Sequence, residues 1–188
     1  MLKKIILIGV GIVLLIGLGV RARQSKGAEP AQPYAETKGS VAHSAREPFI
    51  GVWRAVSISD TRSDGTEVPD LYLGAHPVGL VIYDVSGYMC AGSMNPDRAK
   101  WANPSKATRE DLALAAEGYD TYCGTFDVDE QNQSIVHHVQ VGLNPNDVGV
   151  DLVRTYVFDG KRVKLSGTDG LGPGFKFWTL TFERAKPL

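Results

Sequence analysis

Two side chains that can do chemistry, His137 and Arg154, lie at positions where the surrounding alternation places apolar residues. An imidazole can act as a general acid or base, and a guanidinium can bind a carboxylate through two parallel hydrogen bonds. The residues in the same phase as these two are Ile135, Val139, Val141 and Leu143 around His137, and Val150, Leu152, Tyr156 and Phe158 around Arg154. Both polar groups are therefore expected inside the fold.

His137 has two possible roles that the sequence leaves open. It is either a hydrogen-bond donor that faces a ligand or a core histidine whose partners belong to the protein. Its neighbour His138 must point to the opposite face, because successive side chains of a strand alternate. The pair therefore does not form a two-histidine metal site, and the sequence predicts neither a metal nor another cofactor.

Arg154 needs a partner, because an isolated buried charge costs several kcal/mol. That partner is either a protein carboxylate or the anionic head of a ligand, and the second possibility predicts selection of anionic molecules. Aromatic residues of these and other predicted strands complete the candidate cavity lining. With His137 and Arg154 the candidates are Tyr122, Tyr156, Phe126 and Trp178.

These residues need strands to position them, and period-two alternation between turn signals predicts such strands. Three runs fill residues 119–158, and a first strand is expected at 49–58, followed by a polar turn at 60–65. Further strands are expected at 78–83, 88–91, 162–166 and 175–183, and a helix at 109–117. Thr108 and Asp111 have the spacing of a capping box for that helix. The sequence thus predicts an all-β protein, a closed or nearly closed antiparallel barrel of about eight strands with one short helix.

Composition excludes some functions. The chain has 188 residues, a formal net charge of −1, 21 glycines and 10 prolines. A near-neutral charge gives no basic surface for nucleic acid. The frequent turn residues favour a β fold over a helical bundle. The glycine-rich stretch 167–174 lacks the Lys-Ser/Thr of a phosphate-binding loop, so we expect a mobile loop at the rim of the barrel.

The first 47 residues form two segments distinct from the domain at 48–186. Residues 1–23 combine Lys3 and Lys4 with an apolar run, which is typical of a signal peptide or an uncleaved signal anchor. We favour the anchor, with the domain outside the cytoplasm, over cleavage and secretion. Residues 24–47 lack large apolar side chains and are predicted to be a disordered tether.

Cys90 and Cys123 allow one intramolecular disulfide. Such a bridge is possible outside the cytoplasm. The sequence does not show whether their strands are neighbours, so two free and mostly buried thiols are the expectation.

Ordered motifs resemble a known family. Gly51-Val52-Trp53 is similar to the Gly-x-Trp opening of lipocalins. Further blocks resemble the bacterial and fungal lipocalin-like domain family: residues 77–83, 87–89, 94–98, 118–119, 124–126, 136–139, 145–146 and Arg154. The resemblance covers about residues 48–184 and implies a small β-barrel with an interior cavity. It carries over no catalytic residues.

The same resemblance implies that Arg184, near the end of the last strand, covers Trp53 at the closed end of the barrel, beside Gly51. The phase of the first strand conflicts with this arrangement, because Val52 and Val56 lie opposite Trp53. Either both faces of that strand are buried or a bulge changes its phase after Trp53.

The expected function is binding of a small, largely apolar molecule that is neutral or anionic. One alternative is an enzyme, an isomerase, cyclase or hydrolase that uses His137 as general acid or base and Arg154 to hold an anion. A further alternative is a structural or interaction module with a filled barrel. The sequence does not determine the ligand or the oligomeric state; the one other expected partner is a membrane, through residues 1–23.

Overall fold

The structure is a computed structural model that describes residues 45–103 and 105–186. The predicted anchor and nearly all of the predicted tether lie outside these residues. Within the described part of the chain, no helix is both long and apolar enough to cross a membrane.

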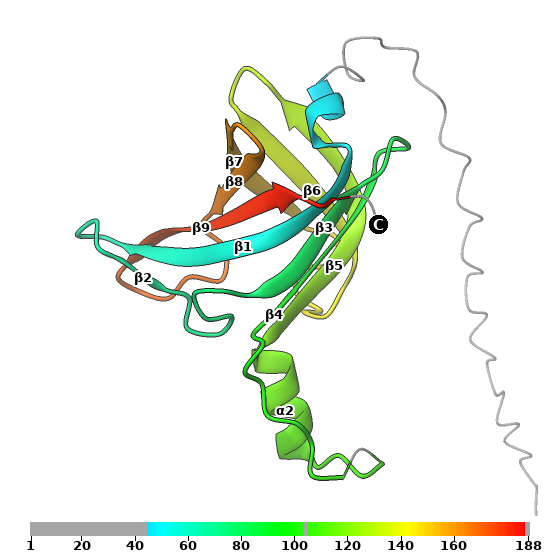
Figure 1. Ribbon diagram of the computed structural model, residues 1–188, viewed down its shortest axis with the longest axis vertical. Coiled ribbons are helices and arrows are strands. Elements are labelled where there is room, and N and C mark those ends of the chain that lie inside the picture. Colours follow the sequence, from blue (N-terminus) through cyan, green and yellow to red (C-terminus); the bar gives the residue numbers. More distant parts are fainter. Residues whose placement is uncertain (1–44, 104, 187–188) are drawn as a thin grey trace, which may run out of the picture. The chain divides into compact units, whose positions relative to one another are not determined.

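Antiparallel strands form a closed barrel (Figure 1). The strands are β1 (Gly51–Arg62), β2 (Glu67–Pro69), β3 (Val78–Tyr83), β4 (Tyr88–Met94), β5 (Tyr119–Asp129), β6 (Ser134–Gly142), β7 (Asp151–Asp159), β8 (Arg162–Gly167) and β9 (Phe175–Arg184). Strands β3 to β9 follow one another in chain order, and β1 closes the barrel by pairing with both β3 and β9. The short β2 pairs only with β1, so eight strands make the wall, as predicted.

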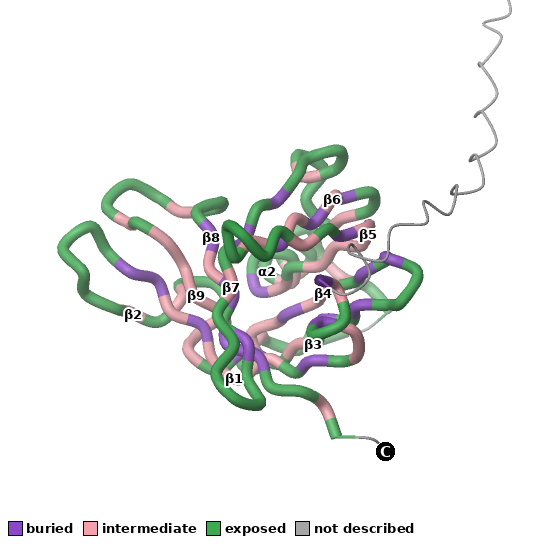
Figure 2. The backbone as a smooth tube through the Cα atoms, turned by 90° about the horizontal axis from the view of Figure 1, so that it is seen from above, coloured by how far each residue is buried: buried purple, intermediate pink, exposed green. Residues whose placement is uncertain are grey.

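The interior is built by the alternation that the sequence displays. Phe126 on β5, Ile135 and His137 on β6, and Arg154 on β7 are buried, whereas their chain neighbours are more exposed. Figure 2 shows the resulting change between buried and exposed residues along the strands. Val141, which continues the phase of His137, is exposed, because the β5–β6 register shifts between Cys123 and Gly124.

A β-bulge settles the phase of the first strand. The register between β1 and β9 shifts between Ala55 and Ser57, so Trp53 and Ile58 both face the interior. The strand also runs on to Arg62, four residues beyond its expected end. The prediction of a polar turn from Asp60 is therefore wrong at its start, because Asp60 is a buried strand residue that pairs with Trp178 on β9.

The helix α2 (Arg109–Glu117) has the predicted bounds and the predicted capping box. The Thr108 side chain accepts a hydrogen bond from the Asp111 backbone, and the Asp111 carboxylate accepts one from the Thr108 backbone. None of its residues is buried, and the helix projects from the ends of β4 and β5 (Figure 1).

One end of the barrel is plugged by aromatic side chains. The short 3₁₀ helix η1 (Glu47–Phe49) brings Phe49 into edge contact with Tyr83 and Tyr156, with ring centroids 5.7 and 4.9 Å apart. Phe49 is 1% exposed. Side chains in this arrangement leave no room for a ligand, so we call it the closed end.

The predicted contact between Trp53 and Arg184 lies at the closed end. The Arg184 guanidinium carbon is 4.2 Å from the Trp53 ring centroid, and its nitrogens donate to the carbonyls of Ile50 and Pro48 at 2.7 Å. Gly51 has a φ of 124°, and a Cβ there would come within 2.9 Å of the Arg184 Nη1 atom. The Gly-x-Trp motif thus combines a backbone angle that favours glycine with space for this arginine.

Replacing Arg184 by alanine is expected to lower the free energy of unfolding by about 1–2 kcal/mol, through loss of the cation–π contact and two hydrogen bonds. Urea denaturation measures the change, and Arg54→Ala, at an exposed position of β1, is the control, expected within about 0.5 kcal/mol of wild type. Equal effects of the two substitutions would contradict the assigned role.

The folded part begins earlier than predicted, before Pro48. Ala45 is buried, and Arg46 forms an ion pair with Asp127 while its guanidinium lies 5.3 Å from the ring of Phe126. Residues 45–47, assigned to the tether from their composition, therefore belong to the barrel domain.

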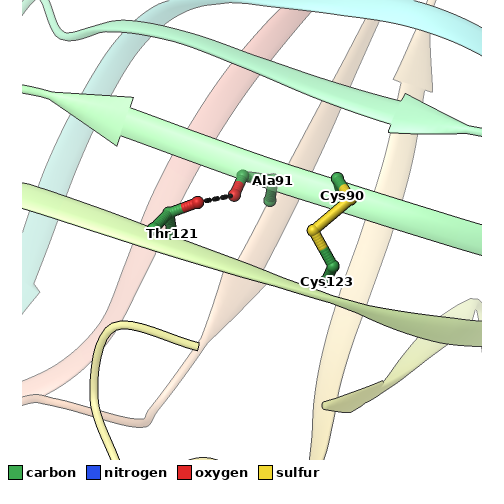
Figure 3. Close-up of a disulfide and its surroundings, with 4 residues drawn as sticks. All are labelled: Cys90, Ala91, Thr121 and Cys123. Carbon is green, nitrogen blue, oxygen red and sulfur yellow. Dashed lines mark hydrogen bonds between the residues drawn. A yellow bond between two sulfur atoms is a disulfide. The ribbon is translucent and has the colours of Figure 1, made fainter. Parts of the chain in front are cut away.

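Cys90 and Cys123 form a disulfide, so the expectation of two free thiols is wrong. The two residues are direct partners in the register of β4 and β5, 33 positions apart in the chain. Figure 3 shows the bridge beside the hydrogen bond from the Thr121 hydroxyl to the Ala91 carbonyl, at 2.9 Å. Disulfides persist in oxidising compartments, so this one points to a location outside the cytoplasm.

Candidate functional site

A partly open cavity of about 650 Å³ occupies the barrel beyond the aromatic plug. Its inner wall is largely apolar, formed by Ile58, Val81, Leu165, Leu180 and Phe182. Loops that follow β2, β6 and β8 contribute Leu73, Asn144, Asp147, Leu171 and Gly172. A cavity of this size matches the range of small-molecule sites.

His137 lies beneath the cavity between two tyrosines. Its Nε2 atom is 2.9 Å from the Tyr83 hydroxyl, and its Nδ1 atom is 2.8 Å from the Tyr122 hydroxyl. In a neutral imidazole one nitrogen donates and the other accepts, so both are satisfied by these hydroxyls. His137 is only 2% exposed. It is therefore a core histidine with protein partners.

Burial sets the protonation of this Tyr–His–Tyr group. Desolvation, with a smaller effect of the Arg154 charge, lowers the pKa of His137 to about 3. Desolvation also raises the pKa of Tyr122 to about 12, and that of Tyr83 well above its usual value. All three groups are therefore neutral near pH 7, in agreement with the hydrogen bonds they share.

Arg154 is paired with a protein carboxylate. Its Nη1 and Nη2 atoms donate to the two carboxylate oxygens of Asp169, at 2.5 and 2.8 Å. The guanidinium carbon also lies 4.8 Å from the ring centroid of Trp178, whose Nε1 donates to the Asp169 carbonyl at 3.1 Å. Of the two partners left open by the sequence, the protein carboxylate is present, and the expectation that Arg154 selects anions loses its basis.

A glycine makes room for this cluster. A Cβ at Gly167 would lie 2.5 Å from a Trp178 ring carbon and 2.9 Å from an Asp169 carboxylate oxygen. The glycine-rich stretch after β8, predicted to be a mobile loop at the rim, supplies the acid that balances Arg154.

The structure separates the six predicted cavity residues into two groups. Tyr122, His137, Arg154 and Trp178 line the cavity. Phe126 and Tyr156 do not: Phe126 is fully buried in the core, and Tyr156 packs against Phe49 at the closed end. Alternation identifies the face of a residue but not its depth along the barrel axis.

The sequence did not identify two acids of the cavity lining, or the tyrosine that holds His137 from the core. Asp60 lines it because β1 is longer than expected, and Asp169 reaches it from a loop. Tyr83 was only part of a family motif, yet it holds His137. A bulge after Trp53 was one of the two explanations for the phase of the first strand. That bulge turns Ile58 and Asp60 to the inner face, so it could have identified Asp60 as a cavity residue.

His138 points away from His137, as alternation requires. On the outer surface its ring nitrogens contact Asp151 at 2.6 Å and Asp127 at 3.1 Å, and the hydrogen bond to Asp151 is the main cause that raises its pKa. Within residues 45–103 and 105–186, no group of three histidine, cysteine or acidic side chains is placed to hold a metal ion.

The fold and its cavity define a class of proteins, the closed antiparallel β-barrels of eight strands that surround a single interior site. The family model described as "Lipocalin-like domain" matches residues 50–185, and the chain belongs to this family. The predicted resemblance is thus confirmed. Such a barrel is consistent with small-molecule binding in general. Comparison with curated proteins gives no match.

Proposed function

We propose that this domain binds a small, largely apolar molecule in the barrel cavity. The open cavity of about 650 Å³, with Val81, Leu165 and Leu180 in its wall, is the observation that carries this proposal. This cavity disagrees with a filled barrel, which is the arrangement expected of a purely structural module. Burial of apolar surface contributes about 25 cal/mol per Å², so a ligand that covers this wall would gain affinity without strong polar contacts.

The enzyme alternative has less support. A general base works best when its pKa is near the working pH. His137 has a pKa of about 3, and both of its nitrogens are held by tyrosine hydroxyls. Arg154, which would hold the anion in that alternative, is already paired with Asp169. These groups support a fixed polar layer beneath the cavity better than a site of proton transfer.

We also propose that the domain acts outside the cytoplasm, either anchored through residues 1–23 or exported. The Cys90–Cys123 disulfide supports an oxidising compartment. The basic and apolar composition of residues 1–23 supports a signal or anchor segment.

A neutral fluorescent probe, N-phenyl-1-naphthylamine, tests the binding function directly. Its emission should rise when the protein is added, and Ala91→Trp should weaken its binding by about tenfold or more, because Ala91 lines the cavity and an indole there would occupy part of it. Val153→Trp is the control, because Val153 is 57% exposed and does not line the cavity.

The control should bind the probe as the wild type does. Absence of any fluorescence change, or equal binding by the Ala91→Trp and wild-type proteins, would contradict the proposed function. If the probe binds as expected, mass spectrometry of small molecules that co-purify with the domain would identify candidates for the natural ligand.

A further inference from the structure

Carboxylates outnumber cations around the cavity. Six acidic residues and two arginines are among the described residues that line it. The acids are Asp60, Asp70, Glu117, Asp120, Asp147 and Asp169, and the arginines are Arg62 and Arg154. Since Asp169 already neutralises Arg154, five acids face a single remaining arginine. A cavity with this excess of negative charge attracts a cation and repels an anion.

Among the residues that the structure describes, Asp60 has a buried carboxylate oxygen without a hydrogen-bond partner. It is only 6% exposed and lines the cavity, and its Oδ1 atom is buried without a hydrogen-bond partner among the described residues. Buried polar atoms are paired in the large majority of cases, so an exception needs an explanation. Asp60 lines the cavity, so a small rotation of its side chain would let a donor supplied by a ligand hydrogen-bond the carboxylate, and such a donor is an explanation.

The carboxylates around the cavity also disturb one another. Burial and the nearby charge of Asp70 raise the pKa of Asp60. Loss of hydration and the charges of Asp147 and Asp169 raise the pKa of Asp120. A positive charge placed among these groups would relieve that repulsion, and they would in turn favour the charged form of a basic ligand.

We propose that the ligand is an amine with an apolar body, whose ammonium group binds at Asp60 while the body packs on the apolar wall of the cavity. This inference rests on the proposed function and specifies its ligand class. A metal cation is the other positive partner that carboxylates bind. It is not favoured, because no three acidic, histidine or cysteine side chains among the described residues are close enough together to hold one.

Three compounds with one naphthyl body and different head groups test the proposal. They are 2-(1-naphthyl)ethylamine, 2-(1-naphthyl)ethanol and 1-naphthylacetate, which present an ammonium, a hydroxyl and a carboxylate near neutral pH. Isothermal titration should give the tightest binding for the amine and the weakest for the carboxylate. The amine preference should shrink as salt is added, because salt screens charge–charge attraction.

Asp60→Asn should weaken binding of the amine by about tenfold or more, while binding of the alcohol changes by less than about twofold. Asp97→Asn makes the same change of charge at an exposed position outside the cavity lining, and should leave all three affinities unchanged. Asp60→Asn should also raise the melting temperature of the unliganded protein, since it removes an unpaired buried carboxylate.

The outcomes separate this inference from the function on which it rests. If the alcohol binds in the cavity and the amine binds no more tightly, the binding function stands and the amine proposal is overturned. Equal loss of amine affinity in Asp60→Asn and Asp97→Asn also overturns it. If none of the three compounds binds and the neutral probe does not bind either, both proposals fail.

Discussion

Removing the carboxylate of Asp169 is expected to lower the free energy of unfolding by about 3 kcal/mol, because Asp169→Ala leaves the Arg154 guanidinium buried without its charged partner. The Arg154 side chain is 4% exposed, so water replaces the two lost hydrogen bonds only in part. The expected loss lies at the lower end of the range for broken buried pairs, since the Asp169 side chain itself is 43% exposed. Urea denaturation of the wild-type and variant proteins measures the difference.

The opposite substitution should be much milder. Arg154→Met removes the buried charge, and the half-exposed Asp169 carboxylate can then be hydrated, so we expect a loss below about 1 kcal/mol. Thr168→Ala, at an exposed position of the same loop, controls for general effects of changing the loop. If Arg154→Met cost as much as Asp169→Ala, the asymmetry argued from burial would be wrong.

Acid should destabilise the protein through His137. Its pKa is about 6.5 in the unfolded chain and about 3 in the fold, so below pH 6.5 the unfolded chain binds a proton that the folded state excludes. The stability that His137 contributes is therefore complete above about pH 6.5 and is lost as the pH falls toward 3. Between about pH 7 and pH 4 the expected loss is about 3 kcal/mol.

Comparison with His137→Gln isolates this effect, because glutamine cannot bind a proton in this range. The free energy of unfolding is measured at pH 7 and at pH 4 for both proteins. Its decrease between the two pH values should be about 3 kcal/mol smaller in the variant than in the wild type. His138 works in the other direction: its raised pKa stabilises the fold at low pH, and this contribution is lost as the pH rises. His138 is present in both proteins and cancels in the comparison, and equal acid sensitivity of the two would refute the buried neutral imidazole.

The predictions for the Arg154–Asp169 pair and for His137 both concern the polar layer that separates the aromatic plug from the cavity. Tyr83, His137 and Tyr122 hold one another, and Arg154 is held by Asp169. These groups have their partners within the protein, whereas Asp60 is the described residue of the cavity wall that has a buried atom without a hydrogen-bond partner. That division of roles supports a binding site for an amine above a rigid polar floor.

Local signals in the sequence determined the elements of this protein. Period-two alternation placed the strands and turned His137 and Arg154 inward, and Thr108 with Asp111 fixed the start of α2. The Gly-x-Trp motif led to the Trp53–Arg184 contact, since it belongs to a barrel whose last strand returns to the first. These properties depend on residues near one another in the chain or on a pattern shared by the family.

Closure of the barrel decided the rest, because partners far apart in sequence meet only when the register of every strand is set. The β4–β5 register made Cys90 and Cys123 opposite one another and allowed their disulfide. Asp169 reaches Arg154 from a loop that carries no regular pattern, and the bulge in β1 turns Asp60 into the cavity. Alternation specifies which face a side chain occupies, whereas its depth along the barrel and its partner across it depend on the tertiary fold.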